Sequence, residues 1–269
     1  MKQKMCVSAI ILAAGKGKRM KEEGVNKVTQ LLRGVPLISY TVGLLQKMKV
    51  SPIFVVIGHA KESVKNALKD ADVVFVEQEE QLGTGHAVKC AMKKIQKTTT
   101  DTIILYGDDS YLYTKKVLNK IINRHMIEES MLTFLTIKVP LPGGLGRVIR
   151  NNKGEVSGII EEKDATEEQR KINEINPNCY IFRAGFLKKY ITKIRKSPIT
   201  GEYYLPALIK IARENNEKIL AVDGGFLPWK GINTKEDLEE AQALMTNATQ
   251  CHPDRRSPKA TAVEGSHST

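Results

Sequence analysis

The sequence predicts an α/β protein with a mixed, mainly parallel central sheet, and three observations lead to this fold class. Short β-branched runs alternate with amphipathic helical patterns over about the first 125 residues, as in consecutive βαβ units. A later segment alternates apolar and polar residues on both sides of Asn152-Lys153-Gly154, which is a hairpin turn signal. The chain has 269 residues and 41% hydrophobic content, which is enough to bury a sizeable core.

The first half, about residues 1–125, has the pattern of a nucleotide-binding fold. Its first strand is expected at Val7–Ala13, where an apolar run leads directly into a glycine loop. Further along, β-branched runs between turn signals predict strands, and apolar residues at helical spacing predict helices. The other expected strands lie at 52–58, 73–78 and 102–107, and the expected helices at 36–46, 61–69, 86–95 and 115–125.

The second half, about residues 126–245, is expected to be a smaller, β-rich part that builds a substrate pocket. The strongest indication is the alternating segment 146–162, which predicts the hairpin. The other elements expected here are strands at 131–139, 179–185 and 218–224 and helices at 186–194, 204–214 and 234–245. From Thr246 to Thr269 the sequence has no periodicity and is rich in Ser, Thr, Pro and charge, so this segment is expected to be a disordered tail or a cloning remnant.

The composition favours anionic partners of small size. Lys and Arg total 42 against 30 Asp and Glu, a formal charge of +12, which suits nucleic acid or phosphorylated small molecules. Aromatic content is 6%, and many lysines, as in "AMKKIQK" and "FLKKYITKIRK", fall at helical spacing on solvated faces. We therefore expect no nucleic-acid partner.

The apolar runs and the cysteines indicate a cytoplasmic protein. The longest apolar stretches have about eight residues, far fewer than the roughly 20 that cross a bilayer, so no membrane association is expected. Lys2 and Lys4 before an apolar run imitate a secretion signal, but that run is short and leads into the glycine loop. The four cysteines are widely scattered without CxxC spacing, which suggests neither zinc nor a disulfide framework.

The loop "GKGKRM", Gly15 to Met20, is a candidate phosphate-binding loop. It lacks the third glycine of a dinucleotide fingerprint, where Met20 stands, and it lacks the spacing of a P-loop. Its backbone N–H groups, together with Lys16, Lys18 and Arg19, can still hold a triphosphate. The alternative is a glycine turn with solvated lysines.

Two further segments carry polar groups suited to a nucleotide. "QEEQLGTGHAV", Gln78 to Val88, offers amide side chains and a Gly-Thr-Gly turn that can read the edge of a base, although a plain polar loop is the alternative. "LYGDDSYL" places Asp108 and Asp109 at the end of a strand, where carboxylates suit Mg²⁺, or where they form a strand-ending turn.

The motifs, taken in order, resemble those of the sugar-nucleotide pyrophosphorylase (nucleotidyltransferase) family. The likeness is greatest to the uridyltransferase domain of bacterial N-acetylglucosamine-1-phosphate uridyltransferases and covers about nine-tenths of the chain. The acetyltransferase β-helix domain of those relatives is expected to be absent, and with it their means of forming trimers. The segments that carry the resemblance are "LAAGKGKRM", Lys27, "QEEQLGTGHA", "YGD", "GR", "GIIEEKDAT", "EIN", "GEYYLPALI" and "GIN".

This resemblance implies a Rossmann-like nucleotidyltransferase domain at 1–245, with a nucleotide-binding half and a sugar-binding half, on which UTP and a sugar 1-phosphate meet. Arg19 and Lys27 would neutralise the phosphates as catalytic residues. Asp108 and Asn233 would ligate Mg²⁺. The implied nucleotide-binding residues are Leu12, Ala13, Ala14, Gly15, Gly17, Gln78, Gln81, Gly83 and Thr84, and the implied sugar-binding residues are Tyr106, Gly107, Gly146, Glu161 and Asn176.

The implied reaction makes a UDP-sugar, a precursor for the cell envelope, and releases pyrophosphate. A sugar phosphate oxygen is already anionic, so attack on the α-phosphorus needs positioning and charge neutralisation instead of a His or Cys nucleophile. His86 opens a helix and is expected to be structural. The alternatives are dTTP or CTP as the nucleotide, glucose 1-phosphate or another acceptor, and a catalytically weak nucleotide-binding homologue.

Several residues depart from the family pattern. Lys18 adds charge beside the triphosphate, and Asn26, in place of the usual Pro, is expected to loosen the turn that aims Lys27. Asp109-Ser110 could alter metal coordination. Pro177-Asn178 and Pro206 lie near the implied sugar pocket, so the sequence leaves the identity of the sugar open, as it does the oligomeric state.

Overall fold

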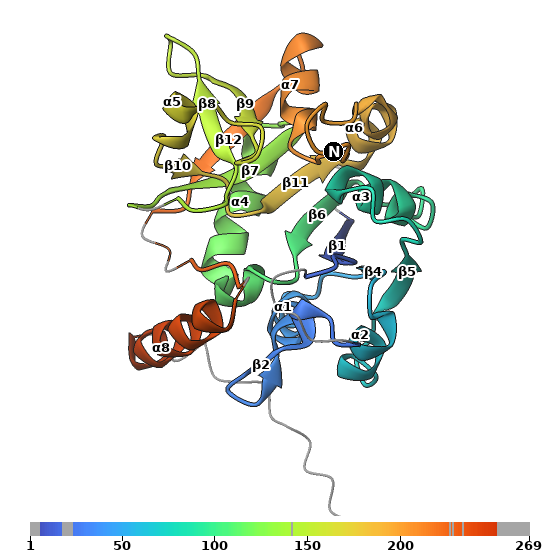
Figure 1. The fold of residues 1–269 in the computed structure, drawn as a ribbon. Coiled ribbons are helices and arrows are strands. Elements are labelled where there is room, and N and C mark those ends of the chain that lie inside the picture. The colour runs from blue at the N-terminus through green and yellow to red at the C-terminus, as the bar shows by residue number, and fades with distance from the viewer. Residues whose placement is uncertain are drawn as a thin grey trace, which may run out of the picture.

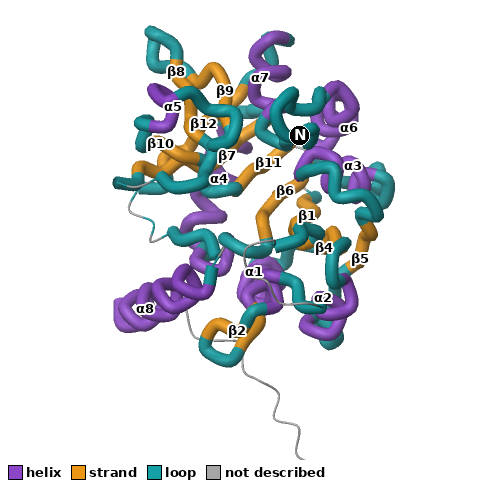
Figure 2. Tube along the Cα trace, viewed as in Figure 1, coloured by secondary structure: helices purple, strands orange, loops and turns teal. Residues whose placement is uncertain are grey.

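The computed structural model describes residues 6–17, 24–140, 142–225, 227, 229–232 and 234–251 of the chain. A single ten-stranded sheet forms its centre, with the strand order β5-β4-β1-β6-β11-β7-β10-β8-β9 and with β12 paired to β7 (Figure 1). Figure 2 shows the strands as one band that runs through the molecule between helices. The predicted α/β fold with a mixed, mainly parallel central sheet is confirmed.

The parallel half of the sheet comes from the first half of the sequence. Its strands are β1 (Val7–Ala13), β4 (Ile53–Ile57), β5 (Val74–Glu77) and β6 (Asp101–Tyr106), all parallel to one another. The central strand β1 is buried on both faces, which explains why it reads as a continuous apolar run. The predicted first strand therefore matches β1 at both ends.

The second half of the chain extends the sheet with mostly antiparallel strands. Strand β11 (Cys179–Arg183) pairs antiparallel with both β6 and β7 (Leu132–Lys138), and so joins the two halves into one sheet. Beyond β7 lie β10 (Glu174–Ile175) and the predicted hairpin of β8 (Arg147–Arg150) and β9 (Val156–Ile160). Strand β12 (Ile219–Asp223) pairs parallel with β7.

Two helical layers cover the sheet because the strands alternate apolar side chains between two faces. In β1, Ala9, Ile11 and Ala13 face one core cluster, whereas Ile10 and Leu12 face the other. Helices α1 (Leu37–Lys47), α2 (Lys61–Ala67) and α4 (Lys115–Ile127) pack on the first face. Helices α3 (Thr84–Met92), α6 (Ala184–Tyr190) and α7 (Ala207–Glu214) pack on the second.

Helix α8 (Lys235–Cys251) packs at the periphery, away from the sheet (Figure 1). Ala241 and Met245 of α8 join Leu32 and Leu37 in a third apolar cluster. That cluster sits beside the small antiparallel pair β2 (Leu31–Leu32) and β3 (Val35–Pro36) and the 3₁₀ turn η2 (Ser110–Leu112). The helix extends past Thr246, where the tail was expected to begin, and residues 252–269 lie outside the described part.

The remaining elements are short. They are the 3₁₀ turns η1 (Lys27–Thr29) and η3 (Ile191–Lys193) and the helix α5 (Glu167–Arg170), which begins with a capping box at Thr166. Within the described residues, no helix is long and apolar enough to span a bilayer. The thiols of the described residues Cys6, Cys90 and Cys179 are free.

Candidate active site

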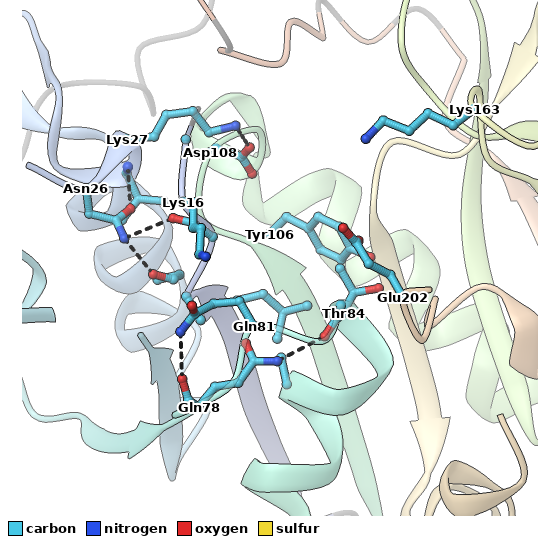
Figure 3. Close-up of a pocket in the computed structure, with 18 residues that line it drawn as sticks. Lys16, Asn26, Lys27, Gln78, Gln81, Thr84, Tyr106, Asp108, Lys163 and Glu202 are labelled. Carbon is cyan, nitrogen blue, oxygen red and sulfur yellow. Dashed lines mark hydrogen bonds and ion pairs between the residues drawn. The ribbon is translucent and has the colours of Figure 1, made fainter. Parts of the chain in front are cut away.

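A cavity of about 400 Å³ opens at the carboxyl ends of β1 and β6. This edge of a parallel sheet is where α/β proteins bind ligands, because the loops that leave the strands diverge there. The cavity volume is large enough for a nucleotide. Figure 3 shows the residues that line the cavity. Its walls are Leu12, Ala13, Ala14, Gly15, Lys16, Gly17, Asn26, Lys27, Val28, Gln78, Gln81, Gly83, Thr84, Ala87, Tyr106, Asp108, Lys163 and Glu202.

The glycine loop forms one wall of the cavity. Residues Leu12 to Gly17 leave β1 and line the cavity in succession. Gly17 adopts a φ of +54°, and a Cβ at that position would lie 3.2 Å from the Cβ of Lys27, so the loop passes close to that lysine. Arg19 and Lys18 lie outside the described residues, and the role of Arg19 stays a prediction.

Asn26 holds this loop in place. Its buried side-chain amide donates to the carbonyl oxygens of His59, at 2.7 Å, and Ala13, at 3.0 Å. Its Oδ1 accepts from the N–H of Val28 at 3.1 Å, which caps the 3₁₀ turn that begins with Lys27. The expectation that Asn26 loosens this turn is therefore wrong, because a polar side chain here makes three bonds that proline would lack.

Lys27 and Asp108 form an ion pair at the rim of the cavity. Their side chains remain 15% and 24% exposed, so the pair is accessible to an anionic ligand. Asp108 directly follows Gly107 after β6, and its carbonyl oxygen accepts from the N–H of Ile232 at 3.3 Å. That bond brings the "GIN" segment beside Asp108, although Asn233 itself lies outside the described residues.

The segment from Gln78 to Thr84 forms the wall opposite the ion pair. Gln78 is 3% exposed, and its amide nitrogen donates to the carbonyl oxygen of Gly83 at 3.1 Å. Gly83 adopts a φ of +103°, and a Cβ there would lie 2.7 Å from the carbonyl oxygen of Tyr203, so only glycine fits. Thr84 accepts from the N–H of Leu205 at 2.9 Å through its hydroxyl. The two halves of the chain are thus joined at this wall.

The residues predicted to bind the sugar divide into two sets. Tyr106 lines the cavity, and burial raises the pKa of its phenol well above the usual value. Gly107, Gly146, Glu161 and Asn176 do not line it. Gly146 lies beside Glu161. A Cβ built on Gly146 would be 3.8 Å from the Cδ of the Glu161 carboxyl group.

Glu161 and Asn176 have different environments. Burial raises the pKa of Glu161 to about 7, with further contributions from the nearby carboxylates of Asp164 and Glu202. Asn176 is buried, and its amide is already used: its nitrogen donates to the carbonyl oxygen of Leu135 at 2.7 Å and its oxygen accepts from the N–H of Asn178 at 3.2 Å. In this structure Asn176 organises the loop before β11.

Asp109 points away from the cavity into the protein. Its buried carboxyl group accepts from the side-chain amide of Asn178 at 2.5 Å. Burial raises the pKa of Asp109 well above its usual range, and the neighbouring Asp108 carboxylate adds to the effect. Asp109 is therefore not placed to coordinate a metal in the cavity, and the two departures Asp109 and Asn178 form one hydrogen-bonded pair.

Two charged residues of the cavity were not among the predicted site residues. Lys163 and Glu202 both line it, from the segments that follow β9 and precede α7 (Figure 3). Both belong to motifs that carry the family resemblance, "GIIEEKDAT" and "GEYYLPALI". The only signal in the sequence was that each motif contains a charged residue. Sequence spacing alone could not show that these two side chains face the cavity.

The donor chemistry at the rim fits Mg²⁺. Magnesium prefers oxygen ligands and is usually held by one or two carboxylates plus substrate phosphates and water. Asp108 supplies an accessible carboxylate beside Lys27. The described residues contain no cluster of three or more His, Cys, Asp or Glu side chains that could hold a metal by themselves.

Residues 9–137 match the model of the MobA-like NTP transferase domain. Over this segment, just under half of the chain, the protein is similar to that family of nucleotidyltransferases.

Curated relatives cover most of this chain. It is 40% identical over 241 residues to the bifunctional protein GlmU of Geotalea daltonii, which is 89% of this chain and 52% of the relative. It is 38% identical to the GlmU of Shouchella clausii, over 88% of this chain and 52% of the relative, and 37% identical to that of Caldicellulosiruptor saccharolyticus, over 94% and 58%. The chain thus spans about half the length of these relatives.

Solved structures share the fold at lower identity. A UDP-glucose pyrophosphorylase in complex with UDP-glucose superposes with a TM-score of 0.74 at 18% identity, over 91% of this chain and all of the other. The inositol-1-phosphate CTP transferase from T. maritima superposes with a TM-score of 0.72 at 19% identity, over 93% of this chain and 98% of the other. At this identity the likeness confirms the Rossmann-like nucleotidyltransferase fold.

Proposed function

We propose that this protein transfers a uridylyl group from UTP to N-acetylglucosamine 1-phosphate or a related sugar 1-phosphate, with release of pyrophosphate. The observation that carries the proposal is the cavity, because it brings the glycine loop, Lys27, the Gln78–Thr84 segment and Asp108 into one site. These segments are far apart in the sequence and have the order and residue types of the uridyltransferase motifs. The 40% identity to a GlmU protein over 89% of the chain supports the same substrate pair.

The nucleotide would bind across the carboxyl end of β1. The triphosphate would contact the backbone N–H groups of the glycine loop and the ammonium group of Lys27, and the base would face the Gln78–Thr84 wall. The sugar 1-phosphate would enter from the side of Tyr106, Lys163 and Glu202, which line the rest of the cavity.

Transfer then requires positioning and charge neutralisation. An anionic oxygen of the sugar phosphate attacks the α-phosphorus in line, a new O–P bond forms, and the bond to the departing pyrophosphate breaks. No general base is needed, because the attacking oxygen carries no proton to remove. Lys27 stabilises the charge that spreads over the phosphoryl oxygens. When bound, Mg²⁺ held by Asp108 and the phosphates would supply additional positive charge at the same place.

Pyrophosphate release tests the proposal directly. The purified protein is incubated with each nucleoside triphosphate in combination with N-acetylglucosamine 1-phosphate, glucose 1-phosphate and other sugar phosphates, with Mg²⁺ and with EDTA. The expected result is Mg²⁺-dependent release with UTP and N-acetylglucosamine 1-phosphate above all other pairs. Release with no UTP pair would overturn the proposal, and a preference for another acceptor would correct the sugar.

A further inference from the structure

His86 lies behind the wall that would contact the base. It sits in the first turn of α3 and does not line the cavity, but its ring contacts the amide of Gln78, which does. Gln78 Nε2 lies 3.0 Å from Nδ1 of His86 and 3.1 Å from the carbonyl oxygen of Gly83. The histidine can therefore affect a bound base through the orientation of this amide.

The orientation of the Gln78 amide follows from its two partners. A backbone carbonyl only accepts hydrogen bonds, so the group that faces the oxygen of Gly83 must be the amide nitrogen. A flipped amide would place two acceptor oxygens against each other there. The NH₂ group has two hydrogens, and Gly83 and His86 take both. Within the described part of the chain no donor reaches Oε1, so this oxygen remains available to a ligand.

The same argument assigns the tautomer of His86. The amide nitrogen of Gln78 has no lone pair to offer, so Nδ1 of His86 must accept, and the proton of the neutral ring is on Nε2. Nε2 lies 3.9 Å from the Sγ of Cys90, one turn further along α3. The ring is thus held between the amide and the helix, with its acceptor directed at Gln78.

We propose that His86 is a positioning residue that selects uracil or thymine over cytosine by holding the oxygen of the Gln78 amide toward the cavity. This inference rests on the proposed function, because it assumes a pyrimidine at this wall. Uracil and thymine carry a hydrogen on N3, which can donate to Oε1, whereas N3 of cytosine carries a lone pair. A site that offers only an acceptor at that position discriminates strongly, because cytosine leaves two acceptors opposed and one buried group unpaired.

A matched pair of variants tests this role. In His86→Leu the acceptor is lost, whereas in His86→Asn the Oδ1 atom can take the place of Nδ1 and accept from Gln78. The affinities for UTP and CTP are measured by calorimetry, and kcat and KM are measured with each nucleotide. His86→Leu is expected to lower the UTP-to-CTP ratio of kcat/KM by about tenfold, mainly through KM for UTP. His86→Asn is expected to keep the ratio within about threefold of the wild type.

A second measurement needs no variant. Nitrogen-15 NMR of the wild-type protein reports the protonation of each histidine ring nitrogen, and His86 is assigned with the His86→Asn spectrum. The expected signature is an unprotonated Nδ1 and a protonated Nε2. A protonated Nδ1 at neutral pH would overturn the inference, because that nitrogen could not accept from Gln78.

The outcomes separate this inference from the proposed reaction. Equal wild-type affinity for UTP and CTP, or an unchanged ratio in a folded His86→Leu protein, would overturn the role of His86 even if transfer occurs. Preferential UTP binding without pyrophosphate release from any sugar phosphate would overturn the proposed reaction, and the binding ratios of the two variants would still test His86.

Discussion

The ion pair of Lys27 and Asp108 places opposite charges at the point where nucleotide phosphates would enter. The side chains keep 15% and 24% of their surface exposed, so the pair is available to a ligand. Phosphate oxygens would attract the ammonium group of Lys27 and free the Asp108 carboxylate for a cation. The pair is therefore best understood as a binding element that is formed before the substrate arrives.

We expect Asp108→Asn to reduce kcat/KM by at least about 100-fold and to weaken the Mg²⁺ dependence, because a neutral amide is a much weaker ligand for Mg²⁺ than a carboxylate. The melting temperature should change little. The matched control is Glu77→Gln, which removes the exposed ion pair with Lys61, 2.8 Å long, and should leave kcat/KM unchanged. Activity of Asp108→Asn within threefold of the wild type would rule out the assigned role.

We expect Glu161 to give the sugar side of the site a pH dependence near neutrality. Burial, Asp164 and Glu202 raise its pKa to about 7, so the group is mostly protonated below pH 7 and mostly a carboxylate above it. A carboxylate accepts stronger hydrogen bonds from sugar hydroxyls than a protonated acid does. KM for the sugar 1-phosphate should therefore fall as the pH rises from 6 to 8.

In Glu161→Gln the fall in KM with rising pH should largely disappear. This comparison separates the ionisation of Glu161 from the second ionisation of the substrate phosphate, near pH 6, which the variant leaves unchanged. The check is a pH profile of KM and kcat for both proteins at saturating UTP. A profile of the same shape in the variant would show that Glu161 does not face the sugar.

At the scale of elements, the loop after β1 and the 3₁₀ turn at Lys27–Thr29 form one unit that is tied together by Asn26. Asn26→Ala removes three hydrogen bonds of a buried side chain and should lower the free energy of unfolding by about 2–3 kcal/mol. For a domain of this size that corresponds to a fall of roughly 5–10 °C in melting temperature.

The control for this prediction is Asn151→Ala. Asn151 also accepts from two backbone N–H groups, those of Lys153 and Glu155, but it lies in an exposed hairpin turn, so its loss should cost much less. Thermal unfolding followed by circular dichroism measures both. Equal shifts in the two variants would contradict the role of Asn26 as a buried tether.

The sequence predicts the longer elements well and the shorter ones poorly. Strand β1 is predicted at its exact bounds because its apolar run leads directly into the glycine loop, which marks the end of the strand. By contrast, β10 and the β2–β3 pair have two residues per strand, and α5 has four, too few to show a period. The insertion of β11 between β6 and β7 also could not be predicted, because it depends on pairing between distant segments.

The candidate site shows the same limit. Motif order led to the residues of the glycine loop and to Gln78, Thr84 and Asp108, which the structure gathers in one cavity. Motif order did not show that the amide of Asn176 donates to a backbone carbonyl of the chain itself, or that Asn26 caps the turn that begins with Lys27. Such facts depend on which backbone groups happen to lie nearby, and a linear pattern does not contain them.

At the scale of the whole molecule, two segments carry positive charge without any acidic residue. Residues 81–100 and 175–201 contain four and six Lys or Arg residues respectively and no Asp or Glu. These segments form α3, α6 and η3, which pack together on one face of the sheet. Lys196 lies 5.5 Å from the ring centroid of Tyr203, whose backbone abuts Gly83 of the cavity wall. This lysine-rich face thus extends to the cavity.

We expect the lysine-rich face to increase the rate at which anionic substrates are captured, because a field of one sign beside a cleft steers ligands of the opposite sign. The triple variant Lys193→Glu/Arg195→Glu/Lys196→Glu should lower kcat/KM for UTP by roughly tenfold in low salt and leave kcat unchanged. The difference should shrink as NaCl rises to about 0.3 M, where screening acts over less than about 10 Å.

The control is Lys47→Glu/Lys49→Glu, two exposed lysines at the end of α1 on the opposite face, which should have little effect. Equal losses in both variants would attribute the effect to net charge, and a salt-independent loss in the triple variant would indicate a direct contact instead of steering.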